Sequence, residues 1–194
     1  MSAGGPQASA TLFSMLVVFS GLPGTGKSSL ARLLAPHLQA AYIRVDSVEA
    51  AILSATGQAA GVTGYAAAYA IAADNLHLGL NVVADSVNPL AVTRQAWRGV
   101  ADQAGTTLVN IEVHCSDQDE HRRRVGHRAD AAALLDGHLP GIWAPPRWET
   151  VQASRQNFEP WAERRLIIET AGQTVSEAFA TLLADLYLSY GVTA

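Results

Sequence analysis

The sequence has 194 residues, enough for one domain of ordinary size or one domain with a small lid. Hydrophobic residues make up 49% of it, so a sizeable core can form. A formal net charge of −4 leaves no basic surplus to hold a long nucleic-acid duplex. The single cysteine, Cys115, excludes an intramolecular disulfide and favours a reducing, cytoplasmic setting. No apolar run approaches the roughly 20 residues of a membrane helix, so no membrane partner is expected.

Short apolar runs alternate with segments of helical period along the whole chain. Residues 1–14 carry little pattern and are predicted to be a flexible extension, followed by one domain over residues 15–194. Five strands are expected, at residues 15–20, 42–45, 80–84, 107–114 and 166–169. The expected helices cover residues 27–38, 62–78, 89–104, 117–135 and 175–190. This alternation predicts an α/β fold of three layers, with a five-stranded parallel sheet covered on both faces.

The turn after the first expected strand matches the phosphate-binding pattern G-x-x-x-x-G-K-[ST]. Glycines let backbone N–H groups surround phosphate oxygens, and the following helix N-terminus adds partial positive charge. Lys27, the only lysine in the chain, would reach the β- and γ-phosphates, and the Ser28 hydroxyl would ligate Mg²⁺. The alternative is a glycine-rich turn that only begins a helix. The predicted nucleotide-binding residues are Gly21, Leu22, Pro23, Gly24, Thr25, Gly26, Lys27, Ser28 and Ser29.

Two aspartates are expected at the carboxyl ends of strands, where open parallel sheets bind ligands. Asp46 closes the second expected strand and Asp85 closes the third. Asp85 suits a magnesium-organising role, and Asp46 suits a general base that accepts a proton from an attacking hydroxyl. For each residue, capping of a turn or of a helix at residues 48–53 is the alternative.

An arginine-rich helix is expected at residues 117–135. Arg124 and Arg128 are four positions apart and share one helix face, where they could clamp the transferring phosphoryl group. A solvated face paired with neighbouring acids is the alternative. The Gly- and Pro-rich stretch at residues 137–148 follows this helix, and residues 117–148 together are predicted to form a lid. A mobile flap and a rigid surface loop are both open for this stretch.

These motifs resemble the small P-loop kinases of the adenylate-kinase-like type. The segment 85–89, Asp-Ser-Val-Asn-Pro, with the Arg124–Arg128 spacing, is similar to polynucleotide 5′-hydroxyl kinases. The segment 45–50, Val-Asp-Ser-Val-Glu-Ala, is similar to chloramphenicol phosphotransferase, in which the aspartate at the Asp46 position is the base. The resemblance implies a helical lid over ATP, with the adenine near the lid and residues 170–173. Polynucleotide kinases carry an arginine where this chain has Glu49.

The sequence therefore predicts a kinase that uses ATP and Mg²⁺ to phosphorylate a hydroxyl group of a small molecule. A nucleic-acid end is a less favoured acceptor, because of Glu49 and the acidic composition. That interpretation would need cations beside Asp46, where Arg44 is the only candidate, with Arg94 and Arg98 further along the chain. A P-loop ATPase or nucleotide-binding switch is the second alternative. Tyr65 and Tyr69 could face the acceptor, or they could serve packing only.

Overall fold

A computed structural model describes residues 14–134 and 145–191, with the backbone alone described at residues 128–134. The five strands are β1 (Met15–Ser20), β2 (Ala41–Arg44), β3 (Val82–Asp85), β4 (Thr107–His114) and β5 (Leu166–Glu169). They form one parallel sheet in the order β2-β3-β1-β4-β5. The five-stranded parallel α/β fold expected from the sequence is therefore confirmed.

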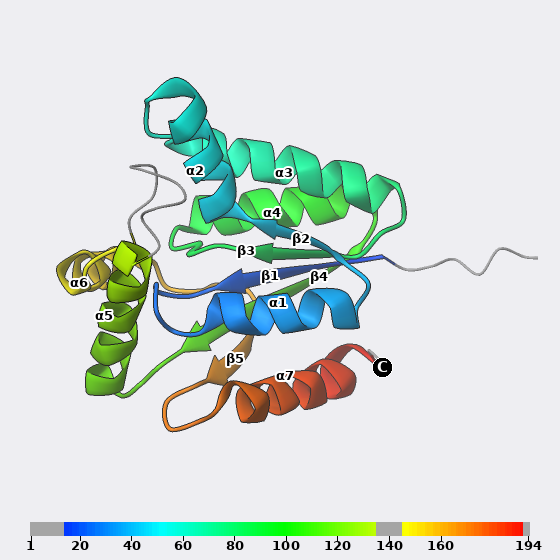
Figure 1. Cartoon of the computed structure of the whole chain (residues 1–194). Helices are drawn as coiled ribbons and strands as arrows, with labels where there is room; N and C mark the ends of the chain where they lie inside the picture. The colour runs from blue at the N-terminus through cyan, green and yellow to red at the C-terminus, as the bar shows by residue number, and fades with distance from the viewer. Residues whose placement is uncertain (1–13, 135–144, 192–194) are drawn as a thin grey trace, which may run out of the picture.

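Seven helices surround this sheet in the described part of the chain. They are α1 (Lys27–His37), α2 (Val45–Thr56), α3 (Val62–His77), α4 (Ala91–Ala104), α5 (Gln118–Leu134), α6 (Trp148–Gln156) and α7 (Val175–Tyr190). Helices α3 and α4 cover one face, and α1 and α7 cover the other (Figure 1). Helices α5 and α6 lie at one end of the molecule, where the strands end at their carboxyl termini (Figure 1).

The two faces of the sheet carry separate apolar cores, because alternate residues of each strand point to opposite sides. Val17 and Phe19 of β1 belong to the core under α1 and α7. Leu16 and Val18 belong to the core under α3 and α4, together with the fully buried Trp97. Both faces of β1 are thus buried, as expected for the central strand of a parallel sheet. None of the described helices is long and apolar enough to cross a membrane.

The junction between β2 and α2 differs from the prediction. Strand β2 ends at Arg44, and α2 begins directly at Val45 with Arg44 as its N-cap residue. Asp46 therefore lies in the first turn of a helix, not at the end of a strand, and it caps nothing with its side chain. Val45 was misassigned because a β-branched residue continues the strand pattern. In the structure Val45 is the first residue of α2, and its side chain is 2% exposed in the core under α3 and α4.

Asp85 closes β3 as expected and pairs in register with Phe19 and Arg44 of the flanking strands. The predicted lid falls partly on described residues: α5 matches the expected helix, whereas residues 135–144 lie outside the described part, as do residues 1–13 of the expected extension. Helix α6 (Trp148–Gln156) was not predicted. It begins two residues after Pro146, with Arg147 as its N-cap residue, and it is only nine residues long, so its helical period is brief.

Candidate active site

The turn between β1 and α1 has the backbone conformation of a phosphate-binding loop. Gly21, Gly24 and Gly26 have φ values of 133°, 88° and 100°, a region that favours glycine. A Cβ atom at Gly21 would overlap the Val113 carbonyl oxygen, and one at Gly24 would lie 2.6 Å from Val125 Cγ2. The loop glycines are therefore required by φ and also, at Gly21 and Gly24, by the close approach of β4 and α5.

Lys27 lies over this loop. Its Nζ donates a hydrogen bond to the Leu22 carbonyl at 2.9 Å, and the side chain is only 6% exposed. The Thr25 hydroxyl donates to the same carbonyl at 2.9 Å. Because α1 begins at Lys27, the N–H groups of its first turn point toward the space in front of the loop. The ammonium and the helix N-terminus thus concentrate positive potential at one place.

Two cavities meet at the residues Lys27 and Ser28. The larger, of about 400 Å³, extends between the loop, α1, Arg124 of α5 and the segment after β5. Its lining residues include Gly26, Arg32, Thr170, Gln173 and Thr174. The smaller, of about 140 Å³, extends toward the ends of β2 and β3. It is lined by Pro23, Lys27, Ser28, Asp46, Asp85, Ser86, Val87 and Pro146.

Both predicted acids line the smaller cavity, and Arg44 connects them. Arg44 Nη2 lies 2.6 Å from Asp46 Oδ2, and Arg44 Nε lies 3.9 Å from Asp85 Oδ2. The Tyr42 hydroxyl donates to Asp85 Oδ2 at 2.8 Å. Burial and the negative charge of Asp85 raise the pKa of Tyr42 to about 12, so this hydroxyl remains a donor at neutral pH. The Asp85 side chain is 3% exposed, whereas 31% of Asp46 is exposed to solvent.

The donors at this cavity fit a magnesium ion. Ser28 supplies a hydroxyl oxygen and Asp85 supplies a carboxylate, beside the place where a phosphate would lie. Mg²⁺ in phosphate-transfer sites binds few protein oxygens and keeps several waters. The described residues contain no group of three or more His, Cys, Asp or Glu side chains that could hold a metal on its own. A shared site of this kind would therefore be completed by nucleotide phosphates.

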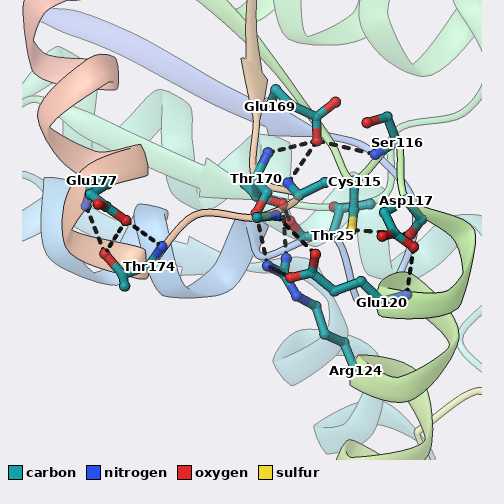
Figure 2. Close-up of polar contacts among 12 residues, drawn as sticks. Thr25, Cys115, Ser116, Asp117, Glu120, Arg124, Glu169, Thr170, Thr174 and Glu177 are labelled. Carbon is teal, nitrogen blue, oxygen red and sulfur yellow. Dashed lines mark hydrogen bonds and ion pairs between the residues drawn. The ribbon is translucent and has the colours of Figure 1, made fainter.

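Arg124 lies on the side of the larger cavity, away from Asp46. Its guanidinium donates to the Thr170 hydroxyl and carbonyl oxygens, each at 2.8 Å, and pairs with Glu120 at 2.6 Å (Figure 2). The Thr170 hydroxyl in turn donates to the Thr25 carbonyl of the loop at 2.9 Å. Arg124 thus joins α5 to both the phosphate loop and β5. The side chain of Arg128 is not described by the structure. That Arg124 and Arg128 together clamp the phosphoryl group therefore stays a prediction.

The segment after β5 is held by backbone hydrogen bonds to two acids. Glu169 accepts from the N–H groups of Ser116, Thr170 and Ala171 (Figure 2). Burial alone would raise the pKa of Glu169, but these three N–H groups hold it below its ordinary value. Thr174 and Glu177 then form a capping box at the start of α7 (Figure 2). The wall of the larger cavity at residues 170–174 is thereby fixed.

His121 of α5 connects the phosphate loop to α6. It is fully buried, and its Nε2 lies 2.8 Å from the Pro23 carbonyl oxygen. Since a carbonyl only accepts, Nε2 carries the proton, and Nδ1 accepts from Arg155 Nη2 at 3.4 Å. Burial lowers the pKa of His121, which keeps the ring neutral. Trp148 packs edge-on against the imidazole at 5.1 Å.

The sequence of the chain matches the model of one known protein family. The model of a family described as an AAA domain matches residues 16–137, which is more than half of the chain and includes the phosphate loop, both acids and α5. The chain belongs to this AAA domain family. The resemblance of its motifs to small P-loop kinases is confirmed for the P-loop domain and its fold. No curated protein matches the chain.

Solved structures similar to this AAA domain include two kinases and one further nucleotide-bound protein. The APS kinase of Mycobacterium tuberculosis, in complex with AMPPNP and APS, has 23% identity and a TM-score of 0.61, covering 89% of this chain and 97% of its own. A gluconokinase from Sinorhizobium meliloti has 17% identity and a TM-score of 0.57, covering 92% and 98%. Kti12 of Chaetomium thermophilum, in complex with ADP-AlF3, has 20% identity and a TM-score of 0.63, covering 87% and 97%.

Several residues of the AAA domain's site were not singled out from the sequence. Tyr42 holds Asp85, Ser86 lines the smaller cavity, and His121 contacts the phosphate loop. No local pattern marks them, because their partners lie 43 and 98 positions away for Tyr42 and His121. Of the two tyrosines considered for the acceptor, Tyr69 serves packing: it lies edge-on against Trp97 at 4.6 Å.

Proposed function

We propose that this AAA domain transfers the γ-phosphoryl group of ATP to a hydroxyl group of a small molecule. The observation that carries the proposal is the smaller cavity, in which Lys27, Ser28, Asp85 and Asp46 line one space. A phosphate-binding cation, two magnesium ligands and a solvent-accessible carboxylate are the groups that phosphoryl transfer to an alcohol needs.

The larger cavity suits the nucleotide. Its volume of about 400 Å³ and its lining by the loop, Arg124 and residues 170–174 support binding of ATP with its phosphates at Lys27. The related folds of APS kinase and Kti12 hold AMPPNP and ADP-AlF3, which supports an adenine nucleotide here as well. Arg124 then contributes positive charge on the nucleotide side of the loop.

Each residue at the smaller cavity has a role in this proposal. Lys27 and the loop N–H groups hold the phosphates and offset the charge that moves onto the leaving oxygen. Ser28 and Asp85 would hold Mg²⁺, which when bound adds positive charge beside the phosphates. Asp46 orients the acceptor hydroxyl and accepts its proton, with Arg44 fixing the direction of the carboxylate at 2.6 Å.

The contacts of Arg94 argue against a nucleic-acid end as acceptor. Arg94 is 2% exposed and donates to the carbonyl oxygens of Pro89, Glu159 and Pro160, with its guanidinium 4.5 Å from the centroid of Trp161. It holds the loop after β3 against the segment before β5, and it is not placed to bind a substrate phosphate. Arg44 is engaged with Asp46.

An acceptor screen with ATP and Mg²⁺ tests the proposal. Alcohols, sugars, hydroxyl-bearing antibiotics and oligonucleotides with a free 5′-hydroxyl would be compared by ADP release and by mass spectrometry of the products. We expect a small-molecule acceptor whose phosphorylated product appears in equal amount to ADP. Steady ATP hydrolysis that no acceptor accelerates would instead indicate an ATPase or a switch. Phosphorylation confined to oligonucleotide ends would indicate an end kinase.

A further inference from the structure

The carboxylate of Asp85 is held through one of its two oxygens. The Tyr42 hydroxyl donates to Oδ2 at 2.8 Å, and Arg44 Nε lies 3.9 Å from the same atom. Neither contact involves Oδ1. Asp85 lines the smaller cavity beside Ser28, and its side chain is 3% exposed. Because Oδ2 accepts one hydrogen bond and faces a guanidinium, Oδ1 is the oxygen that is left to bind a metal ion or its water.

A second contact fixes the direction of the Tyr42 hydroxyl. The guanidinium of Arg32 in α1 forms a hydrogen bond with this hydroxyl. A guanidinium carries donors only, so the phenol oxygen accepts from Arg32 and its single hydrogen is left for Asp85. Arg32 also lines the larger cavity. A chain of contacts therefore runs from the larger cavity, through Tyr42, to the acid that lines the smaller one.

The position of Tyr42 follows from the pairing of β2 with β3. Tyr42 lies opposite Val83 in the parallel register, two residues before Asp85. Residues two apart on a strand share a face, so the hydroxyl and the carboxylate lie on the face that α1 covers. The tyrosine ring packs against the core under α1 and α7, which anchors the phenol along its length.

Ligation through a single carboxylate oxygen distinguishes Mg²⁺ from Ca²⁺. Mg²⁺ requires near-octahedral geometry, keeps several waters and binds few protein oxygens. Ca²⁺ takes six to eight oxygens in a flexible arrangement and also binds a carboxylate through both oxygens. A carboxylate whose second oxygen is engaged by a hydroxyl therefore suits Mg²⁺ and offers Ca²⁺ one ligand fewer.

We infer that Tyr42 is a positioning residue that keeps Asp85 a one-oxygen ligand and thereby makes the site select Mg²⁺ over Ca²⁺. Tyr42 is not among the described residues that line either cavity, so it acts through Asp85. The inference rests on the proposed function only in that a metal accompanies the nucleotide, and its test needs no acceptor.

Isothermal titration calorimetry of AMPPNP binding to the full chain tests this in three conditions: EDTA, saturating Mg²⁺ and saturating Ca²⁺. The ratio of the Kd in EDTA to the Kd with a metal is the gain that the metal provides. For the wild type we expect a larger gain with Mg²⁺ than with Ca²⁺. Tyr42→Phe keeps the ring and removes the donor, so the Mg²⁺ gain should fall about tenfold. The Ca²⁺ gain and the Kd in EDTA should each stay within about twofold of the wild type.

Two further variants bracket this result. Tyr187→Phe is the matched control, because it removes the hydroxyl of a tyrosine that is 58% exposed near the end of α7. Both metal gains should equal those of the wild type in this control. Asp85→Asn is the reference for a damaged metal site and should lose most of the Mg²⁺ gain. The melting temperature of each variant without ligand reports whether the fold is retained.

The outcomes separate this inference from the function beside it. An unchanged Mg²⁺ gain in Tyr42→Phe overturns the inference, and so does an equal fall of the Mg²⁺ and Ca²⁺ gains. Weaker AMPPNP binding in EDTA, with both gains retained, would make Tyr42 a purely structural residue. None of these results touches phosphoryl transfer, which the acceptor screen tests separately. If neither metal strengthens AMPPNP binding to the wild type, the inference fails together with the magnesium part of the proposed function.

Discussion

Arg44 shows how one residue can organise both acids of the site. It is the last residue of β2, lies 2.6 Å from Asp46 and 3.9 Å from Asp85, and so offsets the repulsion between two carboxylates on one cavity. The sequence predicted both acids at strand ends: Asp85 closes β3 as expected, whereas Asp46 lies in the first turn of α2, and the roles of both stay predictions. The sequence was not sufficient to predict the arginine pairing, because that depends on α2 beginning immediately after Arg44.

Glu49 leads to a prediction about stability. Burial, followed by the charge of Asp46, raises the pKa of its carboxyl in the folded state, so ionisation disfavours the fold as pH rises above the ordinary value of 4.5. Glu49→Gln should therefore increase the melting temperature by about 1–3 °C at pH 7. The gain should shrink near pH 4, where the wild-type residue is mostly protonated in both states. Thermal melts across pH 4–8 measure this; an equal gain at both extremes would refute the assignment.

At the scale of elements, α5 and α6 are joined to the phosphate loop through His121. The chain of contacts passes from Arg155 of α6 to the imidazole of α5 and on to the Pro23 carbonyl. A Cβ atom at Gly24 would lie 2.6 Å from Val125 Cγ2, so the loop and α5 are in close contact. Displacement of α5 would therefore disturb the loop that binds phosphates.

Substitution of His121 tests this connection. His121→Leu replaces the imidazole with an apolar side chain of similar size and removes the hydrogen-bond donor to the Pro23 carbonyl. This variant should bind MgADP about fivefold more weakly, which corresponds to the loss of one hydrogen bond. His121→Gln, which retains an N–H donor, should restore part of the affinity. Isothermal titration calorimetry measures both.

His127 provides the matched control for these variants. It lies on the same helix and its side chain is exposed, so His127→Leu should bind MgADP as the wild type does. Equal affinity of His121→Leu and the wild type would show that the contact with Pro23 does not position the loop. Equal loss in both variants would point to a general effect on α5.

Most elements could be predicted from periodicity, and the exceptions have specific causes. The strands and helices around the sheet carry apolar repeats that match their burial, as Val17 and Phe19 of β1 illustrate. Helix α6 was missed because only Val151 is buried among its nine residues, which leaves almost no periodic signal. The role of His121 was missed because its partner Pro23 lies 98 positions away in the sequence.

At the scale of the whole molecule, the phosphate loop divides the carboxyl edge of the sheet into two working sides. Toward β4 and β5 lies the larger cavity with Arg124 and Thr170, and toward β3 and β2 lies the smaller cavity with Asp85 and Asp46. Lys27 borders both cavities. Under the proposed function, this strand order would place the nucleotide and the acceptor on opposite sides of the group to be transferred.

Nucleotide binding should stabilise the whole domain through this loop. At a concentration of MgATP one hundred times its Kd, binding adds about 2.7 kcal/mol to the free energy of unfolding. For a domain of this size, that corresponds to a rise in melting temperature of roughly 5–11 °C. Lys27→Ala should abolish most of the rise in a thermal-shift assay. An undiminished shift in this variant would contradict the role of the loop in phosphate binding.

The central claim is that Asp46 serves as the base in phosphoryl transfer from ATP to a hydroxyl group. Its most direct test is the rate of product formation by Asp46→Asn with the best acceptor, beside MgATP affinity measured on the same protein. We predict that MgATP affinity stays within about twofold, while the rate of transfer falls by about 10²–10⁴-fold. Loss of MgATP binding together with activity would instead make Asp46 a metal ligand or a structural residue, and an unchanged rate would contradict the claim outright.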